Sequence, residues 1–592
     1  MSIFKRHTTI TVGFVVIILL FLMVCYRWIG SNGHEWKSIV DGDGKGYYAY
    51  LDQIFISHNF GSAIADQDQT YVVNNHSVVK FFSGTALLIS PFFLLASFIA
   101  QLFNLPHQAD AEIFQKTISL AALFYLLLGS CFLIRLFKHL HLNKISILGS
   151  LTLILFATNL LAYSLFHPAM SHVYSFCAIS GFLWATNRYI ATNKNKFLLI
   201  SALFYGLIYL IRPVNGVIIL FVPFFFSDFS ALLVFLKSKL RQLLIFAGIF
   251  ITICLVQNML WFIQCGSFFI KAYPYEGFYW LHPQIYQVLF SFRKGLFIYS
   301  PVLLICLLGM VTIFKENRFK SIVGLFFILM ITYIISSWWC WSYFDGFGMR
   351  PFIDYFAVFA LFLAYLFNKI RPWLRIVVMT MGGFCIVFNL FQTWQYTKGI
   401  IHSDYMNFLN YSYVFLKTED KYRNCVGGSN DLIPYNKYNK TLIYESAAFP
   451  LSSEPDSANI IIPKGETEKA FVYDDKFEYN FQLTFQNDTT LFAANKLFAE
   501  IHLQKRELYP CSFYKNLMVI SLNYQDNKPI FYKTFPLNYL PNQTSNQWQN
   551  LDYKIILPTI RNKNYQLKFY IWNKSLDIFL IKNLKIKIYK TS

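Results

Sequence analysis

Two carboxylates near the start of the chain stand in a pattern that could support acid–base chemistry. Asp41 and Asp43 alternate with three glycines, and Tyr47 follows one helical turn later. A carboxylate within hydrogen-bond reach of a hydroxyl group can remove its proton, and glycines allow a ligand to approach the backbone closely. Because Asp-Gly dipeptides also favour turns, the same residues could form a turn. The sequence leaves both interpretations open.

Further candidate residues occur in short motifs along the chain. Three of them, Lys80, Arg212 and Arg350, are cations that could bind an anion, and His172 and Asp354 lie in motifs beside them. Arginine is well shaped to bind phosphate or carboxylate groups. At the end of a membrane span, however, an arginine can also extend its charge to the interface, and His172 could cap or pack a helix. The sequence has no His/Cys/Asp cluster with zinc-binding spacing and no glycine loop of the nucleotide-binding type.

The composition indicates which elements must position these residues. Of the 592 residues, 56% are hydrophobic and 14% are charged, whereas a soluble protein is typically about 45–50% apolar and about 25% charged. The apolar excess predicts an integral membrane protein. The net charge of +20 could indicate nucleic-acid binding, but its distribution along the chain predicts a membrane topology instead.

Most of the net positive charge lies in six basic clusters that flank apolar segments. An excess of Lys and Arg marks cytoplasmic loops, so the following clusters are expected to face the cytoplasm: Lys5/Arg6, Arg135/Lys138/Lys144, Arg188/Lys194/Lys196, Lys237/Lys239/Arg241, Lys315/Arg318/Lys320 and Lys369/Arg371/Arg375. Segments long enough to cross then give eleven predicted spans: 10–30, 113–136, 146–165, 173–190, 198–211, 214–227, 242–263, 298–314, 321–338, 355–368 and 375–395. The N-terminus is expected inside, and the large loop 31–112 and the C-terminal part outside.

Two apolar segments need separate treatment in this topology. Segment 81–103 could cross, but a crossing would move the next basic loop outside, so we expect a juxtamembrane or re-entrant segment interrupted at Gly84 and Pro91. Segment 198–226 must cross twice, and we expect it to break at Arg212-Pro213 on the outer side. With these assignments, all of the candidate residues lie at the outer membrane surface.

The order of these motifs resembles the GT-C superfamily of polytopic glycosyltransferases, and in particular its bacterial branch related to protein O-mannosyltransferases and the lipid A aminoarabinose transferase. The resemblance covers roughly residues 1–395. The matching motifs are Asp43-Gly-Lys-Gly-Tyr-Tyr, Phe82-Ser-Gly-Thr-Ala-Leu-Leu-Ile-Ser-Pro91, Pro168-Ala-Met-Ser-His172, Leu210-Ile-Arg212-Pro-Val-Asn215, Gly295-Leu-Phe-Ile-Tyr-Ser-Pro301 and Phe347-Gly-Met-Arg350-Pro-Phe-Ile-Asp354.

The resemblance implies an all-α polytopic bundle over residues 1–397 in the bacterial inner membrane. Its activity would be transfer of a sugar from a polyprenyl-phosphate donor to a glycan, lipid or protein acceptor on the periplasmic side, with inversion at the anomeric carbon. No nucleic-acid partner is expected.

The resemblance also implies roles for the candidate residues. Asp43 would be the general base or would orient the acceptor, with Asp41 as the second candidate. The lipid phosphate would be bound by Lys80, Arg212 and Arg350, and the substrates would be positioned by Tyr47, His172 and Asp354.

This chain departs from the family at the first acidic motif. Several relatives carry an adjacent Asp-Glu pair where the acids here alternate with glycine. The departure leaves open which carboxylate is the base and whether a divalent metal takes part. If a metal does, Asp66 or Asp68 could supply a second carboxylate.

After Thr397 the composition changes to Lys, Asn, Tyr and Asp with short alternating apolar runs. We expect a linker over 398–442 and a periplasmic β-sandwich over 443–592, with strands at 480–485, 498–503, 516–523, 529–534, 553–557, 565–572 and 578–589. Segments 569–573 and 581–589 resemble jelly-roll modules of the carbohydrate-binding type. In this domain Trp548 and Trp572 could be core residues or a sugar platform, and Cys425 and Cys511 could pair in an oxidising periplasm.

Two other classes of protein compete with the transferase. A non-catalytic glycan-binding or assembly protein would use the β-domain as its working part. A transporter of lipid-linked sugars is less favoured, because the ionisable residues cluster at the outer edge instead of the midplane and the sequence shows no inverted repeat.

Overall fold

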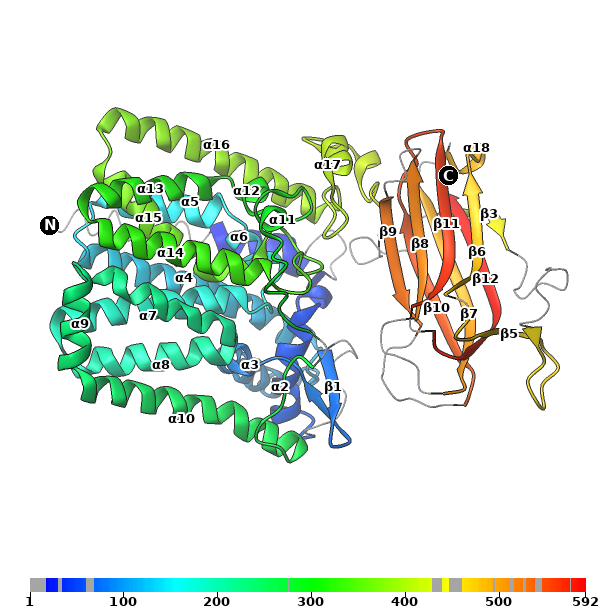
Figure 1. The fold of residues 1–592 in the computed structure, drawn as a ribbon, viewed down its shortest axis with the longest axis horizontal. Helices are drawn as coiled ribbons and strands as arrows, with labels where there is room; N and C mark the ends of the chain where they lie inside the picture. The colour runs from blue at the N-terminus through cyan, green and yellow to red at the C-terminus, as the bar shows by residue number, and fades with distance from the viewer. Residues whose placement is uncertain are drawn as a thin grey trace. The chain divides into compact units, whose positions relative to one another are not determined.

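The structure is a computed structural model, and it describes residues 18–29, 35–59, 69–274, 276–428, 439–446, 460–476, 478–492, 496–509, 516–524, 529–537, 546–574 and 576–591. The chain divides into two compact units, Met1–Thr393 and Trp394–Ser592. The first is mostly helical and the second mostly strands (Figure 1).

The helical unit is a bundle in which long helices such as α4, α7, α8 and α10 lie side by side (Figure 1). Within the described residues, six helices are long and apolar enough to cross a membrane, or up to eight if each of two bent pairs is one span. The chain is therefore a multi-pass membrane protein, whereas the count of eleven spans stays a prediction. The elements are η1 (Val24–Ile29), η2 (Glu35–Ser38), α2 (Asp43–Phe55), β1 (Thr70–Val73), β2 (His76–Val79), α3 (Gly84–Leu102), α4 (Glu112–His139), α5 (Lys144–Phe156), α6 (Leu160–Phe166), α7 (His172–Thr192), α8 (Asn195–Ile211), η4 (Pro213–Phe225), α9 (Phe229–Ser238), α10 (Leu240–Cys265), α11 (Ile285–Phe290), α12 (Leu296–Tyr299), α13 (Val302–Glu316), α14 (Arg318–Ser336), η5 (Arg350–Tyr355), α15 (Phe356–Lys369) and α16 (Pro372–Thr397).

The expected interruption of segment 81–103 is wrong, because α3 runs without a break through Pro91. A proline leaves the carbonyl four residues earlier without its helical partner. Here the hydroxyl of Ser90 donates to the carbonyl of Leu87 at 2.8 Å, which satisfies that group inside an apolar segment. Gly84 begins the helix instead of breaking it, and a Cβ at this position would lie 2.4 Å from the backbone nitrogen of Ile211. Gly84 therefore lets α3 begin directly against the end of α8.

The expected break at Arg212-Pro213 is confirmed. Helix α8 ends at Ile211, Arg212 has an extended backbone, and η4 begins at Pro213. A second break was not expected: segment 146–165 consists of α5 and α6, which are bent by 55°. At this bend the side chain of Asn159 donates to the carbonyl of Phe347 at 2.9 Å, so the interrupted helix contacts the segment that leads to Arg350.

The C-terminal unit contains two antiparallel sheets. One has the strand order β10-β7-β12-β5-β4, with β3 pairing with β12, and the other has the order β6-β11-β8-β9. A strand is present at each of the seven predicted positions, while β3, β4 and β5 were not anticipated. The strands are β3 (Lys440–Glu445), β4 (Ile460–Ile461), β5 (Ala470–Tyr473), β6 (Tyr479–Gln486), β7 (Leu497–Glu507), β8 (Asn516–Tyr524), β9 (Pro529–Pro536), β10 (Gln549–Leu557), β11 (Tyr565–Asn573) and β12 (Phe579–Thr591).

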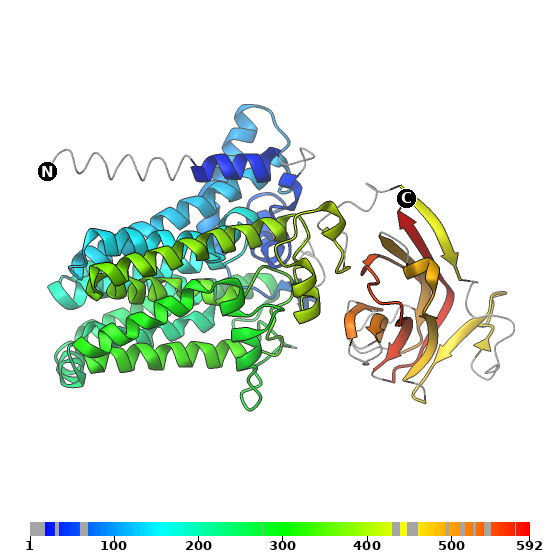
Figure 2. The ribbon, with the colours of Figure 1, turned by 90° about the horizontal axis from the view of Figure 1, so that it is seen from above.

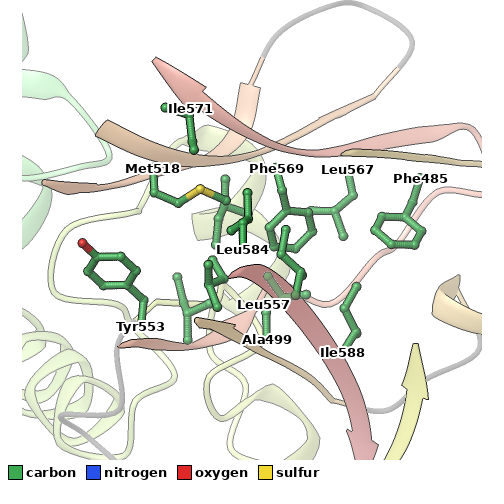
Figure 3. Close-up of a cluster of buried hydrophobic side chains, with 14 of the residues drawn as sticks. Phe485, Ala499, Met518, Tyr553, Leu557, Leu567, Phe569, Ile571, Leu584 and Ile588 are labelled. Atoms are coloured by element: carbon green, nitrogen blue, oxygen red, sulfur yellow. The ribbon is translucent and has the colours of Figure 1, made fainter. Parts of the chain in front are cut away.

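The two sheets enclose one apolar core (Figures 2 and 3). Met518 and Phe569 from one sheet face Leu557 and Ile588 from the other. Buried and partly buried residues alternate strictly along β11, as the period of two in a half-buried strand requires. This alternation is the reason the strands were predictable from the sequence.

The segment expected as a linker carries structure of its own. It contains α17 (Phe408–Val414) and η6 (Asp420–Tyr422), and the side chain of Arg561 donates to Asn410 at 2.6 Å. Gly428 also pairs with Ile556 of β10. Cys425 is buried, and its proposed partner Cys511 lies outside the described residues.

Candidate active site

Asp43 is the first residue of α2, and two glycines bring this helix start into close contact with its surroundings. A Cβ at Gly44 would lie 2.7 Å from the Cβ of Ala169, and one at Gly46 would lie 2.3 Å from the ring of Phe81. No larger residue fits at either position without movement of its neighbour. The alternating glycines therefore let the first turn of α2, which begins with Asp43, pack closely against Ala169 and Phe81.

The side chain of Arg350, from a distant part of the sequence, contacts Asp43. Its Nη2 donates to Asp43 Oδ2 at 2.7 Å, although the two residues are 307 positions apart. The Arg350 side chain is buried, whereas that of Asp43 is 33% exposed. Asp43 thus presents a carboxylate to the outside while a buried guanidinium fixes one of its oxygens.

Asp354, four residues after Arg350, is held in a different way. Its side chain is 1% exposed and accepts three hydrogen bonds, from His172 Nδ1 at 2.8 Å, from Arg212 Nη1 at 3.1 Å and from Asn215 Nδ2 at 2.7 Å. A carboxylate oxygen can only accept, so the His172 proton is on Nδ1. Asp354 is therefore occupied by protein donors, and its position orients Arg212 and His172.

Tyr47 lies on α2 one turn after Asp43. Its hydroxyl donates to Ser171 Oγ at 3.1 Å, and its ring contacts Phe81 with centroids 4.6 Å apart. Burial raises the pKa of Tyr47 to about 12, against the opposing effect of nearby Arg212. The tyrosine therefore keeps its proton at neutral pH and remains a hydrogen-bond donor.

His167, in the loop between α6 and α7, also lies near the site. Burial lowers the pKa of His167 to about 3, and the charges of Arg27 and Arg350 act in the same direction. A neutral imidazole at this place avoids adding a further positive charge beside the two arginines.

Lys80 lies directly after β2 and does not contact the carboxylate of Asp43. Its Nζ is 2.9 Å from Glu276 Oε1, and the indole of Trp339 donates to Glu276 Oε2 at 3.1 Å. The ammonium also lies 5.5 Å from the ring centre of Phe81, and the Phe81 ring contacts Tyr47. Phe81 thus connects the Lys80–Glu276 pair to the helix that begins with Asp43.

The backbone between Trp339 and Arg350 is unusually constrained. Tyr343 and Phe344 have positive φ angles without being glycine, and Gly346 and Gly348 follow with φ of 147° and 63°. Such conformations carry strain that the surrounding structure must hold. The ammonium of Lys294 donates to the carbonyl of Gly346 at 2.6 Å and is buried, so a charged group fixes the segment that delivers Arg350.

The structure gathers most of the predicted residues but separates two of them. Asp43, Tyr47, His172, Arg212, Arg350 and Asp354 form one cluster. Lys80 lies at the edge of this cluster in its pair with Glu276. Asp41 is set apart: its side chain is 58% exposed and accepts from the Gly42 amide, which is the geometry of a turn residue.

Several contacting residues were not singled out from the sequence. Asn215 could have been found, since it follows Arg212 by three residues in the same motif. Ser171, Glu276, Trp339 and Lys294 gave no local signal, because their contacts depend on segments that are distant in the sequence.

A metal site finds no support among the residues that the structure describes. No three His, Cys, Asp or Glu side chains there come together in a way that could hold an ion. Asp66 and Asp68 lie outside the described residues, and a role for them with a divalent metal stays a prediction.

No protein-family model and no curated protein matches this chain. Among solved structures, the archaeal oligosaccharyltransferase AglB from Archaeoglobus fulgidus, in complex with an inhibitory peptide and a dolichol-phosphate, is 13% identical with a TM-score of 0.37, and the match covers 66% of this chain and 56% of that one. The arabinosyltransferase EmbB from Mycobacterium smegmatis is 10% identical with a TM-score of 0.32, and the match covers 98% of this chain and 64% of that one. The chain thus spans less than two thirds of either enzyme, and similarity at this level does not establish a shared fold.

Proposed function

We propose that this chain is a membrane glycosyltransferase that moves a sugar from a polyprenyl-phosphate donor to an acceptor, with inversion at the anomeric carbon. The observation that carries the proposal is the pair of a partly exposed Asp43 and a buried Arg350, beside an Arg212 that Asp354 holds in place. The motif order that resembles GT-C enzymes supports the same assignment.

In this proposal Asp43 is the general base. Its carboxylate removes the proton from an acceptor hydroxyl while the hydroxyl oxygen forms a bond to the anomeric carbon of the donor sugar. The bond from that carbon to the phosphate oxygen breaks, and the phosphate leaves with the bonding electrons. Arg350 fixes one oxygen of Asp43 by a charge-assisted hydrogen bond, so the carboxylate is aimed before the acceptor arrives.

The leaving phosphate requires positive charge close to the breaking bond. Arg212 supplies it in this proposal. Its hydrogen bond to Asp354 uses Nη1, and a guanidinium group has five N–H donors in all. The buried Asp354 is then the positioning residue that orients Arg212, and His172 holds Asp354 by its own hydrogen bond, while Lys80 provides a second cation at the edge of the site.

The location follows from the charge distribution of the loops. We propose that the protein resides in the bacterial inner membrane, with the N-terminus in the cytoplasm and both the site and the C-terminal unit in the periplasm. Cysteine labelling at positions 60 and 140 tests this topology, and the two positions should be accessible from opposite sides.

The catalytic role of Asp43 is tested by comparing two carboxamide variants. Asp43→Asn removes the base, and Asp41→Asn makes the same change at an exposed turn residue whose carboxylate lies 3.9 Å from the ammonium of Lys45. Envelope glycans and the pool of lipid-linked sugars are compared by mass spectrometry in source-organism strains that carry each variant. Only Asp43→Asn should abolish a glycan modification and accumulate a lipid-linked sugar; full activity at normal abundance would refute the assignment.

A specific observation also favours a glycan-binding role for the C-terminal unit. Tyr479 and Trp572 lie on neighbouring strands with ring centroids 5.9 Å apart and planes at 13°. Tyr570 lies 5.9 Å from Tyr479, and Tyr532 lies on β9 of the same sheet. We call these four residues the aromatic strip. Tyr479 lies on β6, and Tyr570 and Trp572 lie on β11. The aromatic strip therefore extends from one edge of the sheet β6-β11-β8-β9 to the other, on its outer face.

Aromatic faces bind apolar C–H surfaces, and their hydroxyl and indole N–H groups bind polar ones, which is the combination that a sugar ring presents. Trp572 is oriented by Glu478, which accepts from its Nε1 at 2.8 Å. The strand orders also support a jelly-roll assignment: if β5 to β12 are numbered one to eight, they read 6-3-8-1 and 2-7-4-5.

Glycan binding is tested with Trp572→Ala in the full-length protein. Retention on immobilised envelope glycans should fall, whereas Tyr509→Ala, which removes another exposed tyrosine outside the strip, should leave it unchanged. Equal retention of both variants and the parent would contradict a binding role for the strip.

A further inference from the structure

Glu276 occupies the place at Lys80 where an anionic group of a substrate would be expected. Lys80 Nζ and Trp339 Nε1 each donate to a different oxygen of its carboxylate, at 2.9 and 3.1 Å. Two donors that converge on the two oxygens of one carboxylate can bind a phosphate in the same way, because both groups present several acceptor oxygens around one centre. We propose that Glu276 is an internal, displaceable anion whose place at Lys80 is taken by the phosphate of the lipid donor.

The pair lies beside the proposed site instead of at a remote surface. The Lys80 ammonium faces the rings of Phe81 and Tyr273 at 5.5 and 6.0 Å, and these two rings contact each other edge to face. Phe81 in turn contacts Tyr47 on α2. An anion bound at Lys80 would therefore be separated from the helix of Asp43 by one aromatic side chain.

The exposure of the pair permits exchange. The side chains of Lys80 and Glu276 are 22% and 18% exposed, in contrast to the 1% exposure of Asp354. A partly exposed ion pair contributes little net stability, so an incoming phosphate that carries more negative charge can replace the carboxylate at small cost.

The loop that carries Glu276 is connected to the segment that delivers Arg350. The backbone amide of Tyr279 donates to the carbonyl of Ser337 at 2.6 Å, and the backbone amide of Trp339 donates to the carbonyl of Gly277 at 2.9 Å. Phe278 and Trp338 form an antiparallel β-bridge between these two bonds. Displacement of Glu276 from Lys80 would thus shift the loop together with residues 337–339 and the Trp339 side chain. Because the constrained residues 343–348 follow directly, occupancy at Lys80 would be transmitted towards Arg350 and Asp43.

The proposal rests on the proposed function for the identity of the ligand, but its test uses binding and needs no sugar transfer. The probe is farnesyl phosphate, and farnesol is the matched probe without the phosphate. Binding to the full-length protein in detergent is measured by titration for the parent, Glu276→Gln and Lys80→Gln. Glu112→Gln is the control, because it makes the same change in the Glu112–Lys116 pair at the start of α4.

Glu276→Gln should bind farnesyl phosphate about fivefold more tightly than the parent, since the competing charge is removed. Lys80→Gln should lose the preference for farnesyl phosphate over farnesol, and Glu112→Gln should behave as the parent. Unchanged or weaker phosphate binding by a Glu276→Gln protein with the parent's melting temperature would overturn the proposal, as would equal tightening for farnesol. Failure of the transferase assay alone would refute the proposed reaction and leave this binding result standing.

Discussion

Each unit of the molecule contains a carboxylate that accepts three side-chain hydrogen bonds, and the two differ in what the carboxylate does. In the helical unit Asp354 is buried and receives His172, Arg212 and Asn215. In the C-terminal unit Glu466 lies on a sheet surface, where it receives Arg506, Lys582 and Trp548 at 2.7–2.9 Å. The number of partners is similar, but the surroundings are not.

Burial decides the energetic weight of these contacts. A buried charge that loses its partner stays desolvated, so breaking a buried pair is expensive, whereas an exposed pair exchanges its partner for water at little cost. The comparison teaches that Asp354 fixes the geometry of its neighbours, while the Glu466 cluster mainly covers a sheet surface with paired charges.

The largest effect is expected from Asp354→Asn. The variant removes the buried charge that balances Arg212 and turns one acceptor oxygen into a donor facing other donors. We expect a loss of about 3–5 kcal/mol in the free energy of unfolding, measured by thermal or denaturant unfolding in detergent. Asp41→Asn, at an exposed turn, should change stability by less than a tenth of that. Equal stability of the two variants would contradict the conclusion that burial gives the contacts of Asp354 their energetic weight.

The next effect concerns activity and is expected from Asp43→Asn. Loss of a general base typically lowers the rate by about 10²- to 10⁴-fold, so sugar transfer should fall by that factor at a temperature where the variant is folded. The melting temperature should also fall, because the buried Arg350 loses its counter-charge, but by less than in Asp354→Asn. This result would show that the carboxylate of Asp43 acts in the reaction, whereas the buried carboxylate of Asp354 holds its neighbours in position. A variant that loses stability and activity in proportion would contradict that division.

A smaller effect is expected from Gly46→Ala. The added methyl group would lie 2.3 Å from the ring of Phe81, and overpacking of this kind costs about 1–3 kcal/mol. Since Phe81 separates Lys80 from Tyr47, binding of farnesyl phosphate should weaken as well. Gly248→Ala, where nothing lies within 4 Å of the added atom, is the control and should affect neither quantity.

The smallest effect is expected from Glu466→Gln, and it should depend on pH. The hydrogen bond from Trp548, together with that from Lys582, lowers the pKa of Glu466 in the folded protein. A lowered pKa contributes stability above the unfolded value of about 4.5 and loses it as the pH falls through the folded value. The melting temperature of the variant should therefore be slightly below that of the parent at neutral pH and equal to it in acid. A difference that grows in acid would contradict this assignment.

The site was predictable from the sequence to the extent that residue chemistry is local. Helix α8 ends just before Arg212-Pro213, because a proline has no amide hydrogen with which to continue the helical hydrogen bonds. Arg350 and Asp354 lie close together because both belong to the short helix η5. The interruption expected at Pro91 was wrong because a neighbouring serine replaced the lost hydrogen bond, a compensation that residue type alone does not reveal.

The sequence by itself determined the membrane class, the helix break at Arg212-Pro213 and the seven main strands, because apolar runs, proline and alternation act within a few residues. Only the tertiary structure decided which carboxylate is buried and which is exposed. It also decided that Lys80 pairs with Glu276, which lies 196 positions away. The physical reason is that burial and charge pairing depend on which distant segments meet, and no local pattern records that encounter.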